Sequence, residues 1–146
     1  MTNEEKSARA MIGWSGCTEP FAICRQLGIQ VLFSPLKGVR GFCERSFDVD
    51  MIFIDTALNP DEAAFVCSHE LGHLLMHSVN SEFLASHTYQ VVGKYELSAD
   101  RFATMLLWPD DHELLEYADL SLEQLSNLMG VSEDLVKWRY EQISME

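Results

Sequence analysis

The residues of this sequence that could do chemistry are concentrated in SHELGHLLMHS, residues 68–78, where three histidines stand at intervals of four. On a helix, His69 and His73 lie one turn apart and about 40° around the axis, so both imidazoles can reach one metal ion. Glu70 lies about 60° from His73, where a general base can take a proton from water at the metal. H-E-x-x-H on a helix predicts a zinc-dependent hydrolase, although helical histidines are often structural.

The third histidine of the run, His77, cannot bind the same ion from one unbroken helix. The helix rises about 12 Å between His69 and His77, whereas the ligands of one zinc ion converge within a few ångströms. We therefore expect His77 to support a ligand from behind, to line the cleft, or to end the helix as a polar group.

A third ligand must come from elsewhere in the chain, and the residues alone leave several candidates. His87 and His112 both lie downstream of the motif. Glu96 and Asp100, spaced i and i+4, share one helix face, so Glu96 could complete the site while Asp100 holds the back nitrogen of a ligand histidine. The alternative is that both are surface acids paired with neighbouring bases.

Two helices must position these residues. Asn59, Pro60 and Glu62 form an N-terminal capping signal, which predicts a helix from about 60 to 77 that carries the histidines. A second helix, carrying Glu96 and Asp100, is expected from about 94 to 108 because Pro109 ends it.

Short strands and further helices surround this pair. Strand-like segments at about 29–33, 39–45 and 51–55, joined by tight turns, predict a small antiparallel sheet. Helices are also expected at about 3–13, 18–28, 121–129 and 132–143. The predicted fold is α+β: a small antiparallel β-sheet packed on a helical core, in one domain spanning 1–146, with the core at about 20–109 and a helical tail at about 110–146.

The composition is that of a folded acidic protein. The 146 residues include 10 Lys and Arg against 23 Asp and Glu, a net charge of −13. This argues against direct nucleic-acid binding, which depends on basic side chains. No export signal or membrane span is recognisable, so we expect a cytoplasmic protein whose four cysteines are reduced and form no disulfide.

The sequence resembles the ImmA/IrrE family of metallo-endopeptidases. The resemblance rests on FAICRQLGIQVLF, GVRGFCE, MIFIDTALNPDEAAFVCSHELGHLLMH and YELSADRFATMLLWP, which together cover most of residues 20–109. The specific parts are the H-E-L-G-H run and the later E-x-x-A-D-x-F-A motif. Trp108 stands where the family pattern usually has methionine, which we interpret as a packing variant.

The resemblance implies a zincin-like core in which His69, His73 and Glu96 bind Zn²⁺, with Mn²⁺ as the alternative ion. Glu70 would be the general base and Asp100 the supporting acid. The implied substrate is a helix-turn-helix transcriptional repressor, whose cleavage would derepress a prophage, a mobile element or a stress regulon. A different class of function would be a metal-containing binding protein that sequesters or remodels a repressor without cutting it.

Two features remain open at this stage. A second donor to the oxyanion is expected, and His77, His87 and Tyr89 are candidates. Residues 120–143 resemble the helix-turn-helix-like tail of the same family, but Glu133 and Asp134 begin the would-be recognition helix and would face phosphates. We therefore interpret the tail as a packing or partner-recognition element.

Overall fold

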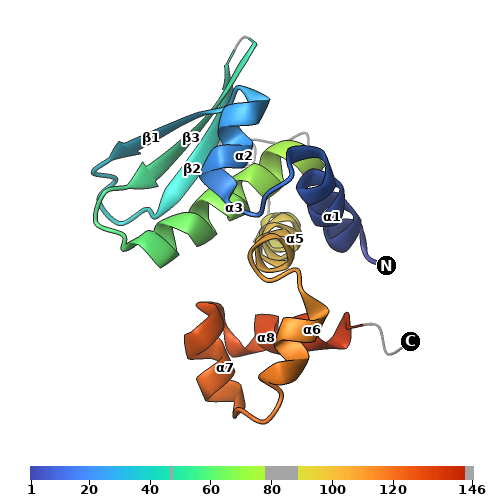
Figure 1. Cartoon of the computed structure of the whole chain (residues 1–146). Helices are drawn as coiled ribbons and strands as arrows, with labels where there is room; N and C mark the ends of the chain where they lie inside the picture. Colours follow the sequence, from blue (N-terminus) through green and yellow to red (C-terminus); the bar gives the residue numbers. More distant parts are fainter. Residues whose placement is uncertain (47, 78–88, 144–146) are drawn as a thin grey trace.

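The computed structural model describes residues 1–46, 48–77 and 89–143, which form a small sheet, two central helices and a group of tail helices (Figure 1). The elements, in chain order, are α1 (Asn3–Ser15), α2 (Pro20–Leu27), β1 (Gln30–Ser34), β2 (Gly41–Ser46), β3 (Val49–Asp55), α3 (Pro60–Met76), α5 (Tyr89–Leu107), α6 (Asp111–Glu116), α7 (Leu122–Met129) and α8 (Glu133–Glu141). The predicted α+β class is confirmed.

The sheet is mixed, with the strand order β1-β3-β2. β2 pairs antiparallel with β3, with Cys43 opposite Ile52, whereas β1 pairs parallel with β3, with Val31 also opposite Ile52. The expectation of an entirely antiparallel sheet was therefore wrong for β1. The chain reverses once between β1 and β2 and again between β2 and β3, so β1 runs in the same direction as the central strand on which it pairs.

One face of the sheet packs on α3, the helix that carries the histidine motif. Cys43, Ile52 and Ile54 alternate along β2 and β3 and are fully buried on this face. Gly41 allows the close approach, because a Cβ at this position would collide with the side chain of Val66. Arg45 ties the far end of β2 to α3 by donating a hydrogen bond to the carbonyl of Leu74. The motif helix is thus fixed against the sheet along its length.

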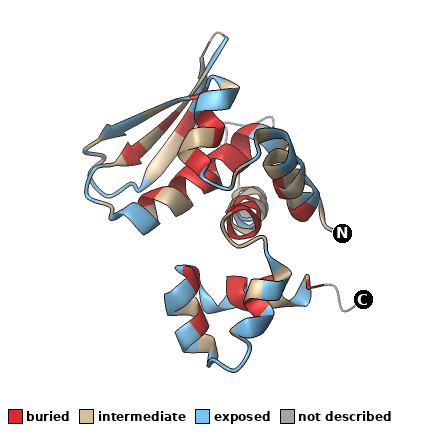
Figure 2. Cartoon of the chain, viewed as in Figure 1, coloured by how far each residue is buried: buried red, intermediate tan, exposed pale blue. Residues whose placement is uncertain are grey.

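The helices α3 and α5 pack side by side, and Figure 2 shows buried residues concentrated where they meet. Phe102 of α5 is fully buried in the main hydrophobic core, which also contains Leu71 and Leu74 of α3. Gly72 makes this contact possible, because a Cβ there would lie 2.9 Å from Cδ1 of Phe102. The glycine of H-E-L-G-H therefore serves helix packing, which brings α5 within reach of the histidines.

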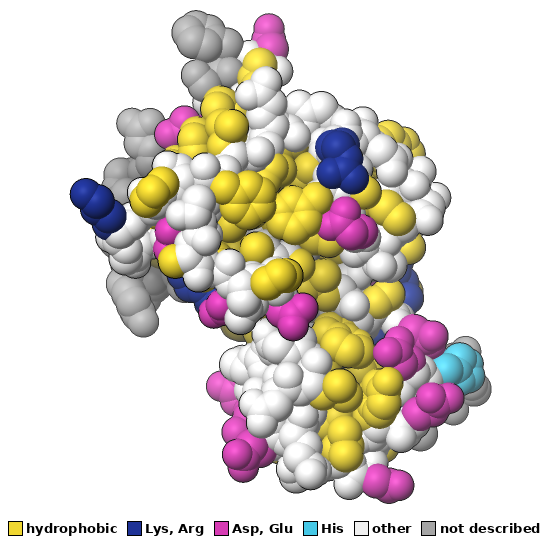
Figure 3. Space-filling view, turned by 60° about the vertical axis from the view of Figure 1, so that its left-hand side comes forward, with side chains coloured by type: hydrophobic (Ala, Val, Ile, Leu, Met, Phe, Trp, Pro, Cys, Tyr) yellow, Lys and Arg dark blue, Asp and Glu magenta, His cyan; other side chains and the backbone are white. Residues whose placement is uncertain are grey.

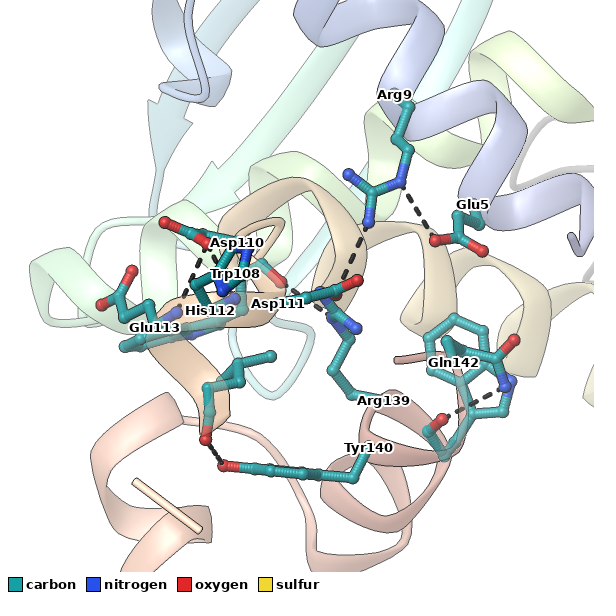
Figure 4. Close-up of polar contacts among 12 residues, drawn as sticks. Glu5, Arg9, Trp108, Asp110, Asp111, His112, Glu113, Arg139, Tyr140 and Gln142 are labelled. Atoms are coloured by element: carbon teal, nitrogen blue, oxygen red, sulfur yellow. Dashed lines mark hydrogen bonds and ion pairs between the residues drawn. The ribbon is translucent and has the colours of Figure 1, made fainter. Parts of the chain in front are cut away.

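The tail helices, α6, α7 and α8, enclose a second hydrophobic cluster that includes Leu114, Leu125 and Val136. A buried arginine joins them to the core: Arg139 donates from Nε to the Trp108 carbonyl over 2.8 Å and pairs with Asp111 over 2.6 Å. Arg9 of α1 also approaches Asp111, at 3.7 Å (Figure 4). The tail is therefore held against α1 and the end of α5.

Several boundaries differ from the predicted ones. α6 was not predicted, although Asp110 caps it by accepting hydrogen bonds from the backbone amides of His112 and Glu113. α5 begins at Tyr89, five residues before the expected start. None of the four cysteines is disulfide-bonded, and Cys24 and Cys67 place their Sγ atoms 3.8 Å apart in the core. Within the described ranges, no helix is long and apolar enough to cross a membrane.

Candidate metal centre

The motif helix α3 begins with a complete capping box. Asn59 accepts a hydrogen bond from the backbone amide of Glu62, and the Glu62 side chain accepts one from the amide of Asn59. Pro60 occupies the first turn, where its missing amide costs nothing. The cap fixes where the helix begins, and the packing of α3 on α5 and the sheet turns His69, Glu70 and His73 toward these neighbours.

His69, His73 and Glu96 converge on one point. The Nε2 atom of His69 lies 3.0 Å from Oε2 of Glu96, and Nε2 of His73 lies 2.7 Å from Oε1 of the same carboxylate. One donor atom from each of the three residues lies within 4.8 Å of the other two. Two imidazole nitrogens and a carboxylate leave a fourth position open around a tetrahedral ion, so the set fits a catalytic zinc site.

The remaining nitrogen of each of these histidines also has a partner. Asp100 Oδ1 lies 2.7 Å from Nδ1 of His69. Nδ1 of His73 lies 3.1 Å from Nδ1 of His77, whose Nε2 lies 3.3 Å from the hydroxyl of Ser98. With a metal ion bound, Nδ1 of His69 and of His73 would be the donors and both Nε2 lone pairs would be free for the ion, which is the tautomer that a metal ligand needs.

Glu70 lies beside the cluster but outside the three convergent donors. Its side chain is 8% exposed, and Oε2 is 3.9 Å from Nε2 of His69. Burial raises the pKa of Glu70 above its usual value, although His69 and His73 oppose the shift. The thiol of Cys43 hydrogen-bonds to the same carboxylate. A buried carboxylate with a raised pKa is suited to accept and return a proton near neutral pH.

The protons of the cluster are distributed as an ion pair. Burial alone would lower the pKa of His69, but hydrogen bonds to Asp100 and Glu96 outweigh it and raise that pKa to about 10. Burial likewise acts against ionised Glu96, but the two histidines hold its pKa well below the usual range. A divalent cation would replace the proton on His69, since metal binding requires neutral imidazole and ionised carboxylate.

The other predicted residues fall into distinct places. His77 lies behind His73 and lines a separate hollow with Tyr95 and Lys94, away from Glu70. His87 lies outside the described residues, as does the side chain of Tyr89, so the second donor to the oxyanion stays a prediction. Glu70, His69 and Glu96 line one open hollow, together with Arg40, Gly41, Phe65, Val66 and Asp100.

Sequence reasoning missed three supporting residues. Ser98, Cys43 and Arg40 lie in stretches that carry the family resemblance, but no role was predicted for them, and they are separated from the three motif histidines by 20 or more positions. Ser98 had one available signal, since it lies two residues after Glu96 on the same predicted helix. The contact of Cys43 with Glu70 depends on the register of β2 against α3, which no local pattern specifies.

Comparison with known proteins decides the family. The model of a peptidase family, M78, described as the IrrE N-terminal-like domain, matches residues 24–141. The chain belongs to this family. Membership in a metallopeptidase family implies a metal ion. In this IrrE-like chain, that ion could be held by His69, His73 and Glu96.

Two relatives and one solved structure extend the comparison. An uncharacterised immunity region protein of Bacillus phage phi105 is 32% identical over 122 residues, covering 81% of this chain and 77% of the relative. Metallopeptidase ImmA of Bacillus subtilis (strain 168) is 27% identical over 139 residues, covering 92% and 82%. A Mycobacterium tuberculosis transcriptional regulator shares the fold, with a TM-score of 0.64 and 18% identity, over 95% of this IrrE-like chain. The chain spans 46% of the length of that regulator.

Proposed function

We propose that this chain is a metal-dependent endopeptidase in which His69, His73 and Glu96 hold the ion and Glu70 is the general base. The observation that carries the proposal is the convergence of three donors beside a buried carboxylate that is not one of them. This is the arrangement that hydrolysis needs, because the base must reach water at the ion without occupying a coordination position.

Each side chain has a defined task in the proposed reaction. A bound divalent ion would supply Lewis acidity toward water and the peptide carbonyl. Glu70 takes the proton from the attacking water and gives it to the leaving amine, and its raised pKa makes the carboxylate a better acceptor in the first of these transfers. Asp100 and His77 keep the ligand imidazoles in the tautomer that presents Nε2 to the ion.

The donor set favours zinc, with manganese as the alternative. Two imidazoles and one carboxylate are typical of catalytic zinc sites, but the same ligands accept other divalent ions. Protein purified without added metal and analysed by inductively coupled plasma mass spectrometry should carry about one zinc ion per chain. Manganese in that position would replace zinc in the proposal, and the roles of the side chains would stay the same.

The proposed substrate is a helix-turn-helix repressor in the cytoplasm, whose cleavage derepresses a prophage, a mobile element or a stress regulon. Support comes from the relatives, one named as a phage immunity region protein and the other as metallopeptidase ImmA. The net charge of −13 suits a basic DNA-binding substrate. The tail helices would then recognise protein and not DNA, because they carry few positive charges for phosphates. Their two Lys or Arg residues are Lys137 and the buried Arg139.

Replacing Glu70 separates cleavage from binding. The zinc-loaded chain is incubated with a helix-turn-helix repressor from the same genome, and the fragments are identified by mass spectrometry. Glu70→Gln should keep its metal and lose at least about 100-fold in cleavage rate, which is the lower range for a general base. Lys6→Gln, at an exposed position of α1, is the control and should cleave normally.

The same comparison tests the alternative function. If the wild-type chain and the Glu70→Gln variant both left the repressor intact and removed it from its operator equally well, the chain would be a sequestering protein. The peptidase proposal would then fall.

A further inference from the structure

A second hollow lies beside the hollow at the metal cluster, on the side of the tail helices. Arg40, Phe65 and Asp100 line both hollows, so the two are neighbours along the surface. The second hollow has a volume of about 470 Å³, within the range of ligand pockets. A polypeptide held at the metal cluster can therefore extend into it.

The walls of the second hollow come from two separate parts of the chain. One wall is the start of α3, with Asn59, Asp61 and Glu62, and the other is the turn between α7 and α8, with Gly130 and Ser132. Phe65 of α3 also packs against the hydrophobic cluster of the tail helices, and so joins the two walls. The tail helices are therefore part of the groove and not a separate appendage.

The lining combines apolar surface with negative charge. Phe65, Val131 and Leu135 supply the apolar part. Three acids, Asp61, Glu62 and Asp100, stand against one base, Arg40.

Most of these charges are already paired. Glu62 lies 3.4 Å from Arg40, and Asp100 bonds to His69, which leaves the exposed Asp61 without an opposite charge in the hollow. Acidic side chains also surround the tail helices on the face drawn in Figure 3, where bases are scarce. The field at this end of the groove therefore favours a cation.

We propose that this second hollow is a substrate subsite that receives a long basic side chain, Lys or Arg, a few residues from the cleaved bond. The apolar lining would contact the methylene stem, and Asp61 at the rim would pair with the charged end. This inference rests on the proposed peptidase function and adds a preference in the substrate, which the tail helices help to read.

A peptide mixture tests the preference directly. The zinc-loaded chain is incubated with synthetic peptides of randomised sequence, and mass spectrometry gives the residues around each cut. We expect Lys and Arg to be enriched at one position near the cut. A matched pair of peptides, with Lys or norleucine at that position, then gives a ratio of kcat/KM values that does not depend on the amount of folded enzyme.

Variants at Asp61 test the assignment of the charge. Asp61→Asn should lower the Lys-to-norleucine ratio about three- to five-fold, as expected for the loss of a partly exposed ion pair, and Asp61→Lys should lower it further. Asp48→Asn, an exposed acid in the turn between β2 and β3, is the control and should leave the ratio unchanged. No enrichment of basic residues, or a ratio that Asp61 variants do not change, would overturn the subsite.

Binding separates this inference from the proposed reaction. Fluorescence anisotropy with the zinc-loaded Glu70→Gln variant measures, without cleavage, the Kd of two pools of randomised peptides that carry either Lys or norleucine at one fixed position (the Lys peptide and the norleucine peptide), so no known cut is needed. Tighter binding of the Lys peptide would support the subsite if adding Asp61→Lys abolished the difference. This would hold even if the wild-type chain cut nothing, and then only the peptidase proposal would fail. Equal binding of the two peptides would overturn the subsite and leave the peptidase proposal standing wherever cleavage is seen.

Discussion

The Nδ1 atoms of His73 and His77 lie 3.1 Å apart, so one imidazole must donate to the other. Burial and the neighbouring His73 lower the pKa of His77 to about 4, so His77 is neutral at physiological pH and can accept. With a metal ion on Nε2 of His73, Nδ1–H of His73 would donate to His77, and Nε2–H of His77 would donate to the hydroxyl of Ser98, 3.3 Å away. The third histidine of the motif thus orients the second.

This chain of hydrogen bonds predicts the effect of its last member. Ser98→Ala should weaken metal binding several-fold, less than the 10–100-fold typical when a direct partner of a ligand is lost. Competition with a chelating dye measures the affinity, and nitrogen-15 NMR should show His77 as the Nε2–H tautomer in the metal-loaded protein. His112→Ala, at an exposed position in α6, is the control. An Nδ1–H tautomer at His77 would contradict the assignment.

Gly72 should be intolerant of a side chain. A Cβ at this position would lie 2.9 Å from Cδ1 of the fully buried Phe102, so Gly72→Ala must push α5 away from α3. We expect a loss of about 1–3 kcal/mol in the free energy of unfolding, typical of an overfilled core, measured by urea denaturation.

The matched control for this substitution lies in the partner helix. Gly93 of α5 has no atom within 4 Å of an added Cβ, so Gly93→Ala should leave stability unchanged or raise it by up to about 1 kcal/mol through helix propensity. Equal effects at the two glycines would show that propensity, and not the contact with Phe102, decides the outcome.

The metal-free protein should lose stability as the pH rises. The pKa of His69 is raised from 6.5 to about 10 in the folded state, so its protonation stabilises the fold fully below about 6.5, and this contribution disappears as the pH rises through 10. Urea denaturation in the presence of a chelator, between pH 6.5 and 9.5, should show the decline. The His69→Ala variant lacks the contribution of the protonated imidazole, so the unfolding free energy of the variant should fall less steeply over the same pH range.

The parts of this fold that could be predicted are those set by local signals at the ends of helices. α3 was located to within a residue because Asn59, Pro60 and Glu62 form a local signal, and local hydrogen bonds act whatever the rest of the chain does. The direction of β1 could not be obtained in this way, because parallel pairing depends on which strand takes the centre of the sheet. α6 has only six residues, too few for a hydrophobic period to be recognised.

The same distinction holds for the site. His69, Glu70 and His73 follow from the geometry of one helix, whereas Ser98 and Cys43 reach the site only through the packing of α5 and β2 on α3. Residue spacing reports contacts within a helix, but contacts between elements depend on close approaches such as that at Gly72, which become visible only in three dimensions.

The third ligand is the assignment with most at stake, and we predict that it is Glu96. Its carboxylate oxygens lie 2.7 and 3.0 Å from Nε2 of His73 and of His69. Asp100 and His77 contact only the opposite nitrogens, so they support the ligands from behind. Glu96→Ala should therefore weaken metal binding more than Asp100→Ala does, and Asp100→Ala more than His77→Ala. The losses of metal affinity for Asp100→Ala and His77→Ala should lie within about 10–100-fold.

Competition with a chelating dye on all variants, each checked for folding by circular dichroism, gives the order of affinities. His87, which lies outside the described residues, is the competing candidate because a third imidazole would serve zinc equally well. If His87→Ala weakened binding more than Glu96→Ala, the ion would be held by three histidines. Glu96 would then be a neighbour of the site and not a ligand. Its hydrogen bonds to the two imidazoles would belong to the metal-free state alone.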